Sequence, residues 1–69
     1  MGNTTEITIK LERIREEKGI GPKEMAKRLG MARSAFYKKK DPESGDRFNE
    51  MQLELFAKEL GYELGLIYK

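Results

Sequence analysis

The sequence predicts a single, mainly α-helical domain that ends in a short β-strand. Apolar residues recur at the three- and four-residue spacing of a helix in four segments, and glycine or proline marks the ends of those segments. The spacing changes to two residues at 62–68, which is typical of a strand. The 69 residues allow one domain, 1–69, and a core of this size supplies only about 3 to 5 kcal/mol of stability. We therefore expect additional stability from pairing with another copy.

The first helical segment begins near residue 5 and ends near Lys18, before Gly19. Its apolar face, at helical spacing, consists of Ile7, Leu11 and Ile14. Asn3 and Glu6 have the spacing of a capping box that would open this helix. Residues 6–10 also alternate polar and apolar side chains, so an extended first turn is the alternative to the helix that we expect.

Residues 22–40 predict two short helices joined by a tight turn. Pro22 suits the first position of a helix, where no N–H is needed, and Gly30 suits a turn with a positive φ. The apolar positions recur at helical spacing: Met25, Ala26, Leu29, Met31 and Phe36. Ala32 is the expected N-cap of the second helix, 33–39, although its side chain accepts no hydrogen bond. Such a helix-turn-helix leaves one face of its second helix free to enter a DNA major groove.

The fourth helix is expected at 49–60, after a loop at 41–46. Pro42 disfavours helix at the residue before it, and the Ser, Gly and Asp that follow are turn residues. Asn49 and Gln52 have the spacing of a capping box. The apolar stripe of this helix, which we expect in the core, consists of Leu53, Phe56, Ala57 and Leu60.

The tail, 62–68, places alternate residues on one face of the expected strand: Tyr62, Leu64, Leu66 and Tyr68. A lone strand leaves its backbone hydrogen-bonding groups unpaired, so this strand needs a partner. We expect it to pair antiparallel with the same strand of a second copy, which makes these four residues the interface of a homodimer. Pairing with residues 7–10 of the same chain is the alternative.

The composition gives little support to catalysis, a cofactor or a metal site. The chain has no Cys and no His, so a thiol nucleophile is missing and no imidazole can activate Ser34 or Ser44. The glutamates lie at helical spacing among Lys and Arg, which favours surface ion pairs over acid–base chemistry. No apolar run approaches the roughly 20 residues of a membrane span, and the first ten residues lack a secretory leader pattern. We expect a soluble, cytoplasmic protein without enzymatic activity.

The charge is unevenly distributed, although the net charge is only +2. Residues 1–40 hold eleven basic and five acidic residues, whereas residues 41–69 hold three and seven. Residues 22–40 alone hold seven basic residues and one acidic residue, Glu24. A positive field attracts phosphate groups and gives affinity for nucleic acid that does not depend on base sequence. A solvated lysine-rich surface is the alternative, but the excess coincides with the helix-turn-helix.

At 15–39 the sequence REEKGIGPKEMAKRLGMARSAFYKK resembles the helix-turn-helix core of the Cro and phage-repressor type, often called the Xre family. The resemblance covers residues 7–60 and depends on five positions at fixed spacing: Ala26, Leu29, Gly30, Met31 and Phe36. It implies a four-helix Cro/repressor-like domain in a transcriptional regulator of phage-repressor or antitoxin type. Such a protein binds double-stranded DNA as a dimer on a palindromic operator.

The resemblance also implies which side chains contact DNA. The family contacts bases from the first, second and sixth positions of its third helix, here Arg33, Ser34 and Lys38, and Tyr37 lies beside them. These side chains suit base edges, because Arg can donate to both O6 and N7 of guanine and Ser can serve either base edge. The implied phosphate contacts surround that helix: Lys23, Lys39, Lys40, Arg47 and Asn49.

Lys40 departs from the family pattern, because many relatives have a Glu there that pairs with the Arg equivalent to Arg15. We therefore expect Arg15 to pair with Asp41 or to face solvent. Lys39 replaces a residue that is usually apolar, which leaves the end of the third helix open.

A protein-interaction module of the same fold is the alternative function. In that reading the third helix or the tail binds a toxin or another protein partner, since a fold does not determine a function. The basic third helix with its tyrosine favours DNA binding.

Overall fold

The computed structural model describes residues 4–67. Within that range the chain forms four helices and one further helical turn, joined by loops. They are α1 (Thr4–Glu17), α2 (Pro22–Arg28), α3 (Arg33–Lys40), α4 (Glu50–Glu59) and α5 (Leu64–Ile67). The mainly helical class is confirmed, and the four expected helices are present with bounds within one residue of those expected. The first turn of α1 is helical rather than extended, and Asn3 of the expected capping box lies outside the described residues.

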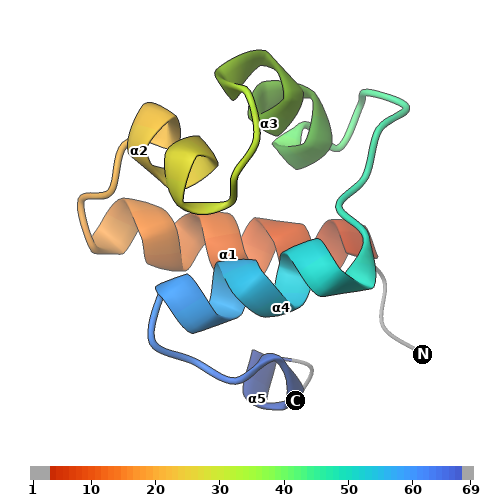
Figure 1. Cartoon of the computed structure of the whole chain (residues 1–69). Coiled ribbons are helices and arrows are strands. Elements are labelled where there is room, and N and C mark those ends of the chain that lie inside the picture. Colours follow the sequence, from red (N-terminus) through yellow and green to blue (C-terminus); the bar gives the residue numbers. More distant parts are fainter. Residues whose placement is uncertain (1–3, 68–69) are drawn as a thin grey trace.

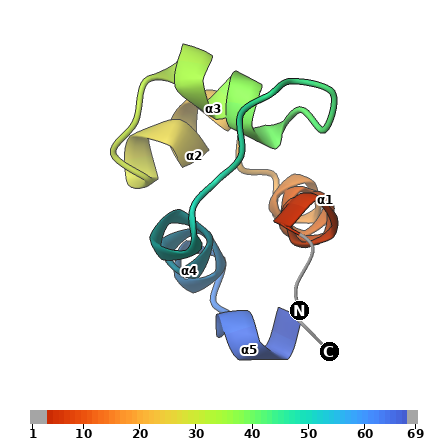
Figure 2. The same cartoon turned by 90° about the vertical axis from the view of Figure 1, so that its right-hand side faces the viewer.

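The helices are arranged in three tiers (Figures 1 and 2). In the middle tier, α1 and α4 lie side by side and run in the same direction. The outer tier on one side is the pair of α2 and α3, and α5 lies on the opposite side, against α1 and α4. The helix-turn-helix is therefore held on one side of the molecule, with the outer surface of α3 uncovered by any other described element.

The core contains a cluster of three phenylalanine rings from different segments. Phe36 lies on α3, Phe48 lies just before α4, and Phe56 lies on α4. Their ring centroids are 5.5 to 5.9 Å apart in tilted and edge-on arrangements, which is the favourable range for aromatic pairs. The other buried apolar residues surround this cluster: Ile7, Leu11, Met25, Ala26, Leu29, Leu53, Ala57, Leu60 and Leu64.

Local signals in the sequence determine two of the helix boundaries. Gly30 has a φ of +70°, and the N–H of Met31 donates to the carbonyl of Ala26 at 3.0 Å, which closes the end of α2. The start of α4 has the expected capping box, because Asn49 accepts from the N–H of Gln52 and Gln52 accepts from the N–H of Asn49. Ala32, the N-cap of α3, makes no side-chain bond, as expected for alanine.

The tail differs from the prediction, because α5 is helical where a strand was expected. Leu64 is buried in the core, whereas Tyr62 is 42 % exposed, so the two do not share a buried strand face. Residues 7–10, one expected partner, belong to α1 and use their backbone groups within that helix. The strand prediction is wrong, and the homodimer contact predicted for Tyr62, Leu64, Leu66 and Tyr68 loses its structural basis. Tyr68 itself lies outside the described residues.

We predict that Phe36→Ala unfolds most of the protein. Removing a buried aromatic ring costs about 3 to 5 kcal/mol, which is similar to the whole stability expected for a core of this size. Urea unfolding followed by far-ultraviolet circular dichroism measures the loss. Tyr37→Ala, which removes an exposed ring from the same helix, is the control and should remain folded; equal stability of the two variants would contradict the importance of the cluster.

Candidate nucleic-acid interface

α3 divides its side chains between the core and the solvent. Phe36 is fully buried, while Arg33, Ser34, Tyr37 and Lys38 are exposed. Residues three and four positions apart lie on the same side of a helix, so these four side chains form one continuous surface, which we call the α3 face. The structure thus brings the four predicted base contacts together on the outer tier of the molecule (Figure 1).

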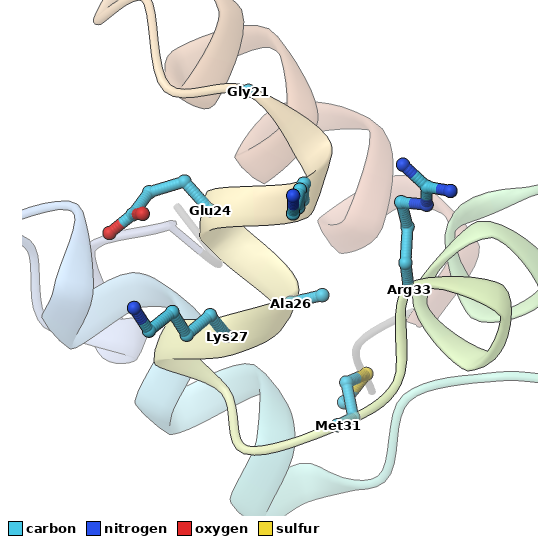
Figure 3. Close-up of a pocket in the computed structure, with 7 residues that line it drawn as sticks. Gly21, Glu24, Ala26, Lys27, Met31 and Arg33 are labelled. Carbon is cyan, nitrogen blue, oxygen red and sulfur yellow. The ribbon is translucent and has the colours of Figure 1, made fainter.

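An open groove lies between α2 and the start of α3 (Figure 3). Its lining residues are Gly21, Lys23, Glu24, Ala26, Lys27, Met31 and Arg33. Figure 3 shows the Ala26 methyl group directed toward the α3 side of the groove, with Arg33 extending along that side and Met31 below. Lys27 points toward the opposite side, next to Glu24. The apolar groups of Ala26 and Met31 therefore lie between Arg33 on one side and Lys27 and Glu24, which carry opposite charges, on the other.

Several cations near this groove have a charged side-chain group that makes no ion pair or hydrogen bond within residues 4–67. They are Lys23, Lys27, Arg33 and Lys38. Arg28, in contrast, pairs with Glu24 at 3.0 Å on the exposed side of α2. The unpaired charges thus gather on the α3 face and the groove, where they raise the local positive potential. Lys27 was missed as a candidate contact, although its position one turn after Lys23 was a signal that the two share a face.

Arg47, a predicted phosphate contact, is directed into the loop between α3 and α4. Its two terminal nitrogens donate to three backbone carbonyls, those of Pro42, Ser44 and Asp46, at 2.6 to 2.9 Å. These three bonds, together with those of the Ser44 hydroxyl and the Asp41 carboxylate, hold a loop that has no regular secondary structure. The Arg47 side chain is therefore committed to its own loop.

The other predicted phosphate contacts at the ends of α3 and α4 also have partners within the chain. Lys39 donates to the carbonyl of Arg47 at 3.4 Å, and the Lys40 ammonium lies 3.4 Å from a carboxylate oxygen of Glu12. The Asn49 oxygen accepts the bond that caps α4. Lys23 is the predicted phosphate contact whose charged group remains unpaired among the described residues. The sequence did not determine where the third helix ends, because Lys39 stands at a usually apolar position; in the structure α3 ends at Lys40.

Arg15 is neither solvent-facing nor paired with Asp41, so both expectations were wrong. Its side chain is buried, and Nε and Nη2 donate to the two oxygens of Glu12 at 2.7 and 2.9 Å. Nη1 donates to the carbonyl of Ile20 at 2.6 Å, in the connection that leads to α2. Asp41 instead accepts from the N–H of Glu43. Glu12, three residues earlier on the same helix, is thus the partner of Arg15 in place of Asp41.

The hydrogen bonds that Arg15 donates to Glu12 raise the pKa of Arg15 above its ordinary value, and they outweigh the opposing effect of burial. A cation with a raised folded-state pKa stabilises the protein at every pH below its unfolded-state pKa. That contribution is lost only when the pH rises through the folded-state value, in strongly alkaline solution. The Arg15–Glu12 pair thus keeps its cation throughout the physiological range.

Two other kinds of site find no support within residues 4–67. Nowhere in that range do three His, Cys, Asp or Glu side chains gather in a way that could hold a metal ion. None of its helices has both the length and the apolar character required to cross a membrane.

Comparisons of the chain with protein-family models, with curated proteins and with solved structures found no match.

We predict that Glu12→Gln destabilises the protein by about 3 kcal/mol, because it leaves the buried Arg15 cation without its countercharge. Urea unfolding measures the difference. Glu16→Gln is the matched control, since Glu16 lies 3.8 Å from the same guanidinium but is 71 % exposed. An exposed pair contributes less than about 1 kcal/mol, so similar losses in the two variants would contradict the special role of Glu12.

Proposed function

We propose that this protein is a sequence-specific, double-stranded DNA-binding transcriptional regulator of the Cro and phage-repressor type. The observation that carries the proposal is the α3 face: exposed side chains suited to base edges lie opposite the buried Phe36, beside a groove edged with unpaired cations. A helix anchored on one side and polar on the other fits the B-DNA major groove, which is about 12 Å wide.

Each side chain of the α3 face has a role in this proposal. Arg33, at the first position of α3, donates from its forked guanidinium to O6 and N7 of a guanine. Ser34 can donate to or accept from either base edge, and Lys38 can reach guanine or a phosphate. Tyr37 contacts the edges of neighbouring bases through its ring and hydroxyl group.

The cations of α2 provide affinity that does not depend on sequence. Lys23 and Lys27 are exposed, lie one helical turn apart and line the same groove as Arg33, with Lys27 directed to the side opposite Arg33. Lysine ammonium groups in such a position bind backbone phosphates and release the cations condensed on DNA. Their contacts would set the register with which α3 enters the major groove.

We propose that two copies bind a palindromic operator. α3 has eight residues and is therefore only about 12 Å long, so a single copy reads few base pairs. Two copies whose recognition helices are about 34 Å apart would enter successive major grooves on one side of the duplex. The combined contacts of two half-sites then give useful affinity.

Binding to random duplex DNA over a series of salt concentrations tests the proposal. Affinity at low salt that falls linearly in a double-logarithmic plot would support it. Absence of affinity even at low salt would contradict it and favour the protein-interaction module. Selection from a library of random duplexes then reports the half-site sequence and the half-site spacing together.

We predict that Arg33→Ala weakens binding to the selected operator by about 1 to 3 kcal/mol and relaxes base preference at one position of each half-site. Competition between operator variants measures the preference. Arg13→Ala, which removes an exposed arginine from α1, should leave the preference unchanged. A uniform loss on all duplexes after Arg33→Ala would show that Arg33 contacts phosphate instead.

Lys23→Ala should weaken binding to the operator and to random duplex alike, because a phosphate contact carries no base information. The slope of the salt dependence should fall by about one counterion. Lys58→Ala on α4, which removes a similarly exposed lysine, is the matched control and should keep the slope. A change of base preference after Lys23→Ala would contradict the phosphate assignment.

A further inference from the structure

We propose that Lys40 is a positioning residue that holds the Tyr37 ring on the α3 face, and that Glu12 holds Lys40 in place. The relevance to base recognition rests on the proposed function, whereas the contacts themselves do not. This role differs from the phosphate contact predicted for Lys40 from the sequence.

The Lys40 ammonium lies between an acidic group and an aromatic ring. It is 3.4 Å from Oε1 of Glu12 on α1 and 5.6 Å from the centroid of the Tyr37 ring on α3. Tyr37 and Lys40 are three residues apart on the same helix, a spacing that places their side chains next to each other. A cation within about 6 Å of a ring centroid is attracted by the negative charge above the ring face.

Glu12 is itself held firmly. Its carboxylate accepts two hydrogen bonds from Arg15, whose remaining nitrogen donates to the carbonyl of Ile20. The Arg15 guanidinium carbon also lies 5.9 Å from the centroid of the buried Phe36 ring. A continuous set of contacts thus leads from the core to Lys40 and from there to Tyr37.

Tyr37 needs such support because the residue is 45 % exposed. An exposed aromatic side chain changes rotamer freely unless a neighbour restrains it. Restraint before binding reduces the entropy lost when the ring is fixed against DNA. The Lys40 side chain is only 28 % exposed and its charge is directed toward Glu12, so its position suits support of the ring better than contact with phosphate.

Lys40→Met removes the charge and keeps an unbranched side chain, which makes it the test variant. Lys18→Met is the matched control, because the Lys18 ammonium lies 5.9 Å from the centroid of the Tyr62 ring, away from the α3 face. Both variants lose one positive charge and one lysine–tyrosine contact. Lys40→Arg should rescue the native behaviour, because a guanidinium can pair with Glu12 and also lie over the ring.

The first measurement uses the free protein and does not depend on DNA binding. Nuclear magnetic resonance should show that the ring-proton signals of Tyr37 shift in Lys40→Met, return toward native in Lys40→Arg and stay unchanged in Lys18→Met. Unchanged Tyr37 signals in Lys40→Met would overturn the proposal even if the protein binds DNA. If the native protein binds no duplex, the proposed function fails, and the Tyr37 signals alone decide whether Lys40 positions the ring.

The second measurement is the base preference of each variant on the selected library. Lys40→Met should change the preference by about 2- to 5-fold at the base pair that Tyr37→Leu also affects, as expected for the loss of an exposed cation–ring contact. The double variant should show no further change. A uniform loss on all duplexes, with a salt slope lower by about one counterion and unchanged base preference, would instead show that Lys40 contacts phosphate and would overturn the proposal.

Discussion

The burial of Phe36 against Phe48 and Phe56 is the constraint on which the rest of the structure depends. These rings join α3, the loop and α4 in one cluster, and a chain of this length has few other large apolar groups to bury. Once Phe36 points inward, helical geometry determines which side chains of α3 point outward. The chemistry of the α3 face is therefore a consequence of how the core is packed.

The same geometry gives different environments to three consecutive lysines at the end of α3. Lys38 is exposed on the α3 face, whereas Lys39 and Lys40 turn toward the loop and α1 and find oxygen partners there. All three charges interact favourably with the negative end of the helix dipole. Because Glu12 neutralises charge on the inner side, the unpaired cations remain where a phosphate backbone could approach.

Local sequence signals were sufficient for the helices but not for contacts made over a longer range. The ends of α2 and the start of α4 follow from Pro22, Gly30 and the Asn49–Gln52 capping box, each of which acts within a few residues. The alternation in the tail was misleading, because a spacing of two residues does not reveal whether a partner strand exists, and the described residues contain none. The outward direction of the α3 face could be predicted from the position of Phe36, but the inward direction of Lys40 and Arg47 could not. Their partners, an α1 carboxylate and loop carbonyls, are fixed only once the chain is folded.

The three bonds from Arg47 have a consequence for how freely the sequence of the loop can vary. Every acceptor is a backbone carbonyl, and a carbonyl is present whatever side chain its residue carries. The bonds from Arg47 therefore do not depend on which side chains stand at 42, 44 and 46, although the Ser44 hydroxyl makes its own bonds to the carbonyls of Lys38 and Asp41 and to the N–H of Asp46. A change at Arg47 removes its three bonds at once. We therefore expect substitutions at Pro42 and Asp46 to be tolerated better than a substitution at Arg47.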